Sequence, residues 1–319
     1  MGTPIWKAHW GYALETVYAA TEATPTMWMP LKDNPEYEDN QGYIFDEGMR
    51  AVASKLIGVY PGVHGGSYGA TFDYYPDHAV RFWPAILGAD TVGSSSNGYW
   101  QHTFTQGASP YSATLFDYIG DTGTERQFVG AMMDSLNFRF DRGSNTVQVK
   151  PHWITGAVSS GITETSKSYT TLYPLRGWVP TFSIGGSTKV TLLAFDMTIT
   201  RETNILYPGN NSQQAAAAES GQIDITGKLS LYGSTDGPYT DFRANTAREV
   251  RVRFPDGTAG STYSLLDIIM TSAHFTSVKP DRSGPYLRYD ADFRAKYNTT
   301  DAGSIQVLAT IATSSTLSS

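Results

Sequence analysis

The segment from Tyr99 to Lys150 constrains the fold more than any other part of the chain. It consists of runs rich in aromatic and β-branched residues, and the joints between these runs are Gly107–Pro110, Gly120–Gly123 and Asp141–Ser144. Such runs, separated by clusters of Gly, Asp, Ser and Pro, are typical of consecutive antiparallel strands. The sequence therefore predicts a mainly β protein.

The run Gln127–Phe140 is the longest predicted strand of this segment, and its side chains alternate between two faces. One face carries Phe128, Met132, Leu136, Phe138 and Phe140, and the other carries Gln127, Ser135, Asn137 and Arg139. Neighbouring side chains of a strand point to opposite sides, so this pattern indicates one apolar and one polar face. A strand of this length suits the wall of a barrel or a large sheet.

Later parts of the chain repeat the pattern. Further strands are predicted in Lys189–Arg201, Gln222–Tyr232, Val250–Phe254, Ser264–Phe275, Tyr286–Tyr297 and Ile305–Ile311. Arg81–Gly88 is predicted as a short helix with Gly88 as its C-cap, and Tyr239–Arg248 is a second short helix candidate. The fold expected from these segments is antiparallel β, with one or two short flanking helices and long loops.

We expect three parts along the chain. Residues 1–46 are interpreted as an extended N-terminal arm, because prolines interrupt them and they show no periodicity. Trp6, Trp10 and Trp28 are poor residues for a disordered tail, so the arm is expected to dock on a partner. Residues 47–312 form the β domain, with a glycine-rich loop near 58–75, and residues 313–319 form a polar C-terminal tail.

Composition excludes several classes of site. The chain contains no cysteine, so disulfides and cysteine metal sites are ruled out. Its formal net charge of −7 disfavours a protein that grips DNA, since such proteins are normally basic. Its first residues lack an apolar signal core and no run is long enough to span a bilayer, so neither secretion nor a membrane is expected.

Motifs that suggest catalysis are weak. Gly65–Gly69 matches the pattern of a nucleophile elbow around Ser67, but it lacks the flanking strand and helix that the elbow needs. Asp121–Gly123 resembles one aspartic protease loop, whereas that chemistry needs two. The six histidines are scattered, and His102 is interpreted as a hydrogen-bonded sheet residue. No catalytic, metal or cofactor site is predicted, although a pair of glycosidase carboxylates stays open.

Several stretches, in order over residues 80–312, resemble the major tail tube protein of phages with long, non-contractile tails, the siphophage type. They are Leu87–Gly93, Trp100–Thr105, Gly130–Phe138, Trp153–Gly156, Ile223–Leu229, Phe293 with Ala295, and Gly303–Val307.

The resemblance implies an antiparallel β-sandwich subunit that forms a barrel with its neighbours. It also implies a structural protein of the virion tail, assembled in the host cytoplasm, in which hexameric rings stack head to tail. The tube would enclose a tape-measure protein, meet tail-tip and head-proximal terminator proteins, and conduct double-stranded DNA without sequence-specific binding. The alternative is a carbohydrate-binding or glycan-degrading β-sandwich protein of a virion surface.

A conduit for DNA must not hold the passing strand. Cationic groups bind DNA tightly, so we expect an acidic or neutral inner wall. Asp121, Glu125 and Asp224 are the candidate lumen acids, because they lie in a predicted turn or on the polar face of a predicted strand.

Overall fold

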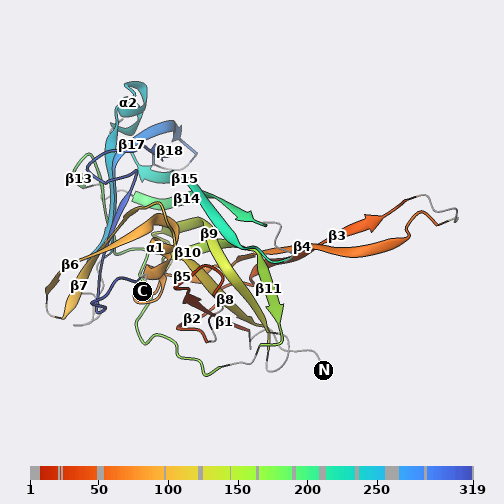
Figure 1. Ribbon diagram of the computed structural model, residues 1–319. Coiled ribbons are helices and arrows are strands. Elements are labelled where there is room, and N and C mark those ends of the chain that lie inside the picture. The colour runs from red at the N-terminus through yellow and green to blue at the C-terminus, as the bar shows by residue number, and fades with distance from the viewer. Residues whose placement is uncertain are drawn as a thin grey trace.

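The protein is built mainly from antiparallel strands (Figure 1). The computed structural model describes all residues except 1–7, 21, 23, 49–53, 97, 121–124, 144, 163–164, 189–191, 208–212, 234–236, 256–265, 284–285 and 318–319. The strands are β1 (His9–Leu14), β2 (Met27–Met29), β3 (Glu36–Asp46), β4 (Gly58–Gly69), β5 (Phe72–Asp73), β6 (Gly88–Ser96), β7 (Tyr99–Gln106), β8 (Ser112–Tyr118), β9 (Arg126–Asp141), β10 (Gln148–Thr155), β11 (Ala157–Ser160), β12 (Thr181–Ile184), β13 (Ser187–Thr188), β14 (Leu192–Leu206), β15 (Ala217–Tyr232), β16 (Arg248–Phe254), β17 (Leu266–Asp281), β18 (Arg288–Ala295) and β19 (Gln306–Ile311). The helical elements are η2 (Ala79–Arg81), α1 (Phe82–Leu87) and α2 (Gly237–Arg243).

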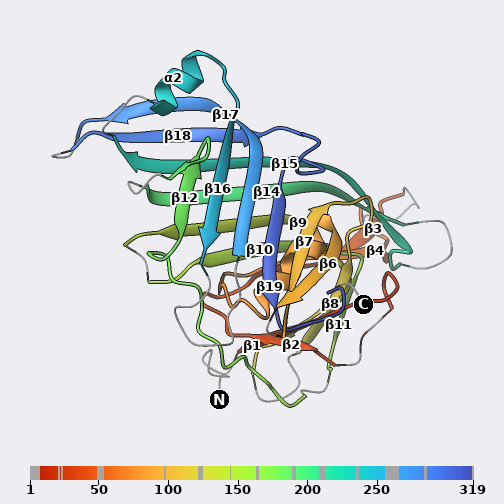
Figure 2. The same ribbon diagram turned by 90° about the vertical axis from the view of Figure 1, so that its left-hand side faces the viewer.

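The strands form two layers (Figure 2). A long sheet has the order β17–β18–β15–β14–β9–β10, with β4 and β5 paired along β10 and β3 outside β4. A shorter sheet has the order β12–β16–β17–β19–β7–β6. Apolar faces of both layers meet in one core, which confirms the antiparallel sandwich expected from the sequence.

Two long strands, β17 and β9, pair with different neighbours at their two ends. The first part of β17 pairs with β16 and β19, and its last part pairs with β18. Strand β9 pairs with β8 and β11 through its beginning, and with β10 and β14 through its end. The long alternating run predicted at Gln127–Phe140 is therefore confirmed as the strand that connects the main parts of the fold.

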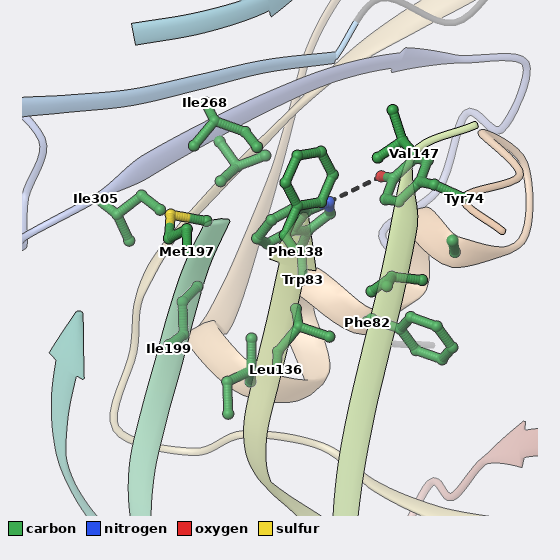
Figure 3. Close-up of a cluster of buried hydrophobic side chains, with 14 of the residues drawn as sticks. Tyr74, Phe82, Trp83, Leu136, Phe138, Val147, Met197, Ile199, Ile268 and Ile305 are labelled. Atoms are coloured by element: carbon green, nitrogen blue, oxygen red, sulfur yellow. Dashed lines mark hydrogen bonds between the residues drawn. The ribbon is translucent and has the colours of Figure 1, made fainter. Parts of the chain in front are cut away.

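Helix α1 lies inside the sandwich. All six of its residues are buried, as expected for a helix that is apolar on every side. Trp83 and Phe138 are in contact there, with ring centroids 5.9 Å apart, and the indole Nε1 of Trp83 donates to the hydroxyl oxygen of Tyr74 at 2.8 Å (Figure 3). Gly88 caps the helix with a φ of 92°, as the sequence predicted.

The interpretation of residues 1–46 as an extended arm is wrong for β1 and β2, whereas β3 does leave the body as one strand of a hairpin. Strand β1 pairs with β2 on one side and β8 on the other, inside the fold. Trp10 is fully buried, and its ring centroid lies 4.7 Å from that of Phe72. Aromatic residues near the start of the chain therefore complete the core of the subunit.

Two further predicted boundaries also differ from the structure. The glycine-rich segment predicted as a loop near 58–75 contains strand β4, which pairs with β3 along its length. The tail predicted as merely polar is tied down, because Leu317 is buried and its backbone N–H donates to the Oδ2 of Asp90 at 2.7 Å.

Candidate functional site

The outer face of the long sheet is a broad polar surface, which we call the polar face. Antiparallel register aligns its side chains in rows across the strands, because paired residues share a face. One row runs Lys150, Asn137, Thr198, Thr226 and Arg294, and the next runs Gln148, Arg139, Asp196, Lys228 and Asp292. The opposite faces of these strands are apolar and buried, so the alternation of the sequence produces this surface directly.

Charged side chains on the polar face have hydrogen-bond partners on the same face. The Nε of Arg294 donates to the Oδ1 of Asp224 at 2.7 Å, and the amide of Asn137 donates to the Oδ1 of Asp196 at 2.6 Å. The Nε of Arg139 donates to the Oε1 of Gln148 at 2.9 Å. Acids and bases alternate across the strands in the second row, whereas the first row carries bases alone. With Asp224 included, the side chains named here comprise four bases and three acids, so this surface carries little net charge.

A shallow hollow of ≈ 350 Å³ lies in the middle of the polar face. The residues that line it include Asn137, Asp196, Lys228, Asp292 and Arg294. Its walls are the flat surface of a sheet, and Asp196, one of the carboxylates among them, already accepts a hydrogen bond from Asn137. This arrangement is a solvated wall.

The second notable surface is the hairpin of β3 and β4, which leaves the body of the molecule on the right of Figure 1. Ile44 is 60% exposed and Phe45 is 58% exposed, on successive residues and hence on opposite faces of the ribbon. Tyr60 pairs with Ile44 and Val59 with Phe45, and both are also exposed. The outer part of the ribbon, at 43–45 and 59–63, therefore exposes apolar side chains on both faces.

Glycines allow the two strands of this hairpin to come close. A Cβ atom on Gly66 would lie 2.5 Å from the carbonyl oxygen of Glu38, and one on Gly62 would lie 2.9 Å from that of Gly42. Only residues without a Cβ fit these positions. The glycine content that suggested a loop is thus a requirement of the ribbon.

The base of the hairpin is fixed to the body through a small cluster. Tyr68 on β4 is buried and its hydroxyl donates to the Oδ1 of Asp117 at 3.4 Å, while the guanidinium of Arg126 lies 4.3 Å from the centre of the Tyr37 ring. Burial raises the pKa of Asp117 to about 6. Farther out, the backbone of His64 is also held, because its N–H donates to the carbonyl oxygen of Gln213 and its carbonyl oxygen accepts from the hydroxyl of Tyr207. The ribbon is therefore anchored to the body as far as His64.

The structure places the predicted arm and lumen residues in different environments. Trp28 is only 3% exposed and, like Trp10, is buried within the subunit, so neither is presented to a neighbour. Glu125 is buried as well, which argues against a position on a channel wall. Asp224 lies on the polar face with its side chain 42% exposed. Trp6 and Asp121 lie outside the described residues.

The catalytic motifs considered in the sequence gain no support. Ser67 lies inside β4, between Glu38 of β3 and Ile154 of β10, and not on a turn that enters a helix. His102 is buried in the sheet, as predicted, and its ring nitrogens contact Asp90 and the carbonyl oxygen of Thr313. The Asp121–Gly123 motif lies outside the described residues.

Neither a metal-binding cluster nor a membrane-spanning helix occurs among the described residues. Within that part of the chain, three or more His, Asp or Glu residues never gather in a way that could hold a metal ion. None of the described helices is long and apolar enough to cross a membrane.

Long two-faced strands and a ribbon without internal cover are features of a subunit that completes its structure through contacts with other chains. The family model described as phage tail tube protein matches residues 6–312. The chain therefore belongs to the phage tail tube protein family and is a structural component of a virion tail. A search of curated proteins found no match.

Proposed function

We propose that this protein forms hexameric rings that stack head to tail into the tail tube of a siphophage-type virion. The tube encloses the tape-measure protein during assembly in the host cytoplasm and later conducts double-stranded DNA during ejection. Tail-tip and head-proximal terminator proteins close its two ends. Membership of the tail tube family supports the tube, and the surfaces of the subunit support the contacts within it.

The β3–β4 hairpin is the observation that carries the proposal. A two-stranded ribbon is marginally stable by itself in water, and its free edges invite pairing with other chains. Here the ribbon also exposes Ile44, Phe45 and Tyr60 on its two faces. Contacts with neighbouring copies remove this apolar surface from water, which makes polymerisation favourable.

In this proposal the polar face lines the lumen. Bases on that face, such as Arg294 and Lys228, have acidic neighbours, which compete with DNA phosphates for them. A wall with little net charge lets the DNA slide through the lumen. Asp224, which the sequence suggested as a lumen acid, remains a candidate for the lumen wall in this proposal, where it neutralises Arg294.

Electron microscopy of negatively stained protein tests the assembly. Purified full-length chain is concentrated with and without the tape-measure protein, and sedimentation velocity measures the mass of each species. We expect rings with sixfold symmetry and tubes made of stacked rings. A protein that remains monomeric over a wide range of concentration and salt, with the tape-measure protein present, would contradict the proposal and favour a sugar-binding module.

A further inference from the structure

We infer that the β3–β4 hairpin of one copy docks on a specific surface of the next copy, formed by α2 and the adjoining ends of β15, β17 and β18. This surface, here named the tyrosine end, comprises Tyr232, Tyr239, Tyr286 and the charged residues of 237–248 and 279–288. The inference rests on the stacking proposed above and names the two surfaces that make the contact.

The tyrosine end exposes three aromatic side chains. Tyr286 is 71% exposed, and Tyr232 and Tyr239 are exposed as well. The rings of Tyr232 and Tyr286 contact each other edge to face, with centroids 6.0 Å apart, so they form a ready-made patch. Tyrosine is enriched in protein interfaces because its ring is apolar and its hydroxyl tolerates water.

The charges of the tyrosine end are mainly basic. Asp241 pairs with Arg248 at 2.8 Å, and Asp281 pairs with Arg288 at 3.0 Å. Lys279 lies opposite Asp290 in the register of β17 and β18, which leaves two exposed bases without an acidic partner among the described residues, namely Arg243 and Arg282. The protein as a whole carries a charge of −7, so such an excess of bases is a local feature.

The hairpin has the opposite charge. Its described part contains the acids Glu38, Asp39, Asp46 and Glu47, whereas Lys55 is its one lysine or arginine. Lys55 pairs with Glu47 at 3.0 Å, so the described hairpin carries a net negative charge. Complementary charge steers two surfaces together and sets their orientation, while the apolar residues between the charges supply most of the affinity. The ribbon and the tyrosine end therefore have opposite charges, and both expose apolar or aromatic side chains.

The arrangement of the two surfaces excludes contact within one copy. The hairpin leaves the body on the right of Figure 1, whereas α2, β17 and β18 lie at the upper left. A contact between two different surfaces of identical chains is heterologous, and it propagates from copy to copy instead of closing as a symmetric dimer. Such a contact is the kind that stacking requires.

A complementation experiment tests the inference with two variants of the full chain. Ile44→Asp alters only the hairpin and Tyr286→Asp alters only the tyrosine end, and both positions are exposed, so the fold is retained. Each variant alone is expected to stop at single rings. When they are mixed, the intact hairpins of Tyr286→Asp rings still fit the intact tyrosine ends of Ile44→Asp rings, and the expected product is a stack of two rings.

The control is Tyr173→Asp, which introduces the same change at a tyrosine that is also 71% exposed but lies elsewhere. It should form tubes as the unmodified protein does. Normal tubes from Tyr286→Asp, or equal loss of stacking in Tyr173→Asp, would overturn the inference while leaving the tube itself intact. Absence of tubes from the unmodified protein would instead refute the proposed function.

Discussion

Arg294 and Asp224 lie side by side on the polar face, joined by a hydrogen bond of 2.7 Å from Nε to Oδ1 between neighbouring strands. Both side chains are substantially exposed, so the pair adds at most about 1 kcal/mol to the free energy of unfolding. The pair matters mainly for DNA binding, because a guanidinium held by a carboxylate is less available to a DNA phosphate.

Replacing Asp224 by Lys is expected to slow genome ejection from otherwise normal virions. The change frees Arg294 and adds a second cation in every subunit, so the effect should be larger at low salt, where screening is weaker. Ejection is followed with a DNA-binding dye at two salt concentrations. Asp224→Asn, which frees Arg294 without adding a charge, should give a smaller delay. An ejection rate equal to that of the unmodified phage at low salt would place this face away from the channel.

Replacing Tyr74 by Phe is expected to destabilise the subunit without changing its shape. The change leaves the buried Nε1 of Trp83 without the acceptor it has at 2.8 Å, which costs about 1–3 kcal/mol of the free energy of unfolding. Urea denaturation followed by tryptophan fluorescence measures the loss. Tyr173→Phe, at an exposed position, is the matched control and should have no effect.

Replacing Asp117 by Asn is expected to alter the dependence of stability on pH. The pKa of Asp117 in the folded protein is raised by burial to about 6 from an ordinary value of 3.8. The folded state therefore binds its proton more tightly, and the unmodified protein loses stability as pH rises from about 4 through about 6. Asparagine does not titrate, so the variant should gain up to roughly 3 kcal/mol relative to the unmodified protein over that range.

Urea denaturation of both proteins at pH 4 and pH 7 checks this prediction. Other carboxylates contribute equally to both curves, so the quantity of interest is the difference between the two proteins. A difference that stays constant from pH 4 to pH 7 would show that Asp117 titrates normally in the folded state.

His102 should control how firmly the C-terminal segment is held. Its Nδ1 lies 3.1 Å from each carboxylate oxygen of Asp90 and its Nε2 lies 3.0 Å from the carbonyl oxygen of Thr313, so both nitrogens must carry a proton to donate. Burial, together with the nearby charge of Arg81, disfavours the charged ring, but these hydrogen bonds and the charge of Asp90 outweigh that cost and raise its pKa. The stabilisation is complete below pH 6.5, the ordinary pKa, and is lost as pH rises through the raised value.

Hydrogen exchange of the Leu317 amide measures this effect, because that amide donates to the Oδ2 of Asp90. Its protection should fall between pH 6 and pH 9, after correction for the intrinsic rate. In His102→Gln the protection should be low at both values. The amide of Gly130, which donates to the Oε1 of Glu15 at 2.8 Å, serves as an internal reference that should not respond.

Strands with one apolar and one polar face could be predicted from the sequence because the signal is local. Alternation along 127–140 and 222–232 identified β9 and β15, and it also placed Asp224 on the outer side correctly. The short helix before Gly88 was predicted from its own residues too. Each of these elements is determined by neighbours in the chain.

Elements that depend on distant partners could not be predicted in this way. Strand β1 is recognisable only beside β8, a partner about a hundred residues away, so Trp10 was assigned to an arm. Strand β4 has a glycine content that suggests a loop, and only the approach of Glu38 to Gly66 explains it. The tyrosine end was missed for the same reason, since Tyr232 and Tyr286 come into contact only in the fold.

Strand β17 also has a mechanical consequence. Because one continuous backbone belongs to both sheets, the layers cannot slide past each other or separate without breaking the ladders that β17 forms with β16, β19 and β18. Each subunit should therefore respond to load as a rigid block. When a tail bends, the curvature should be taken up at the contacts between copies, where the outer part of the β3–β4 ribbon can flex elastically.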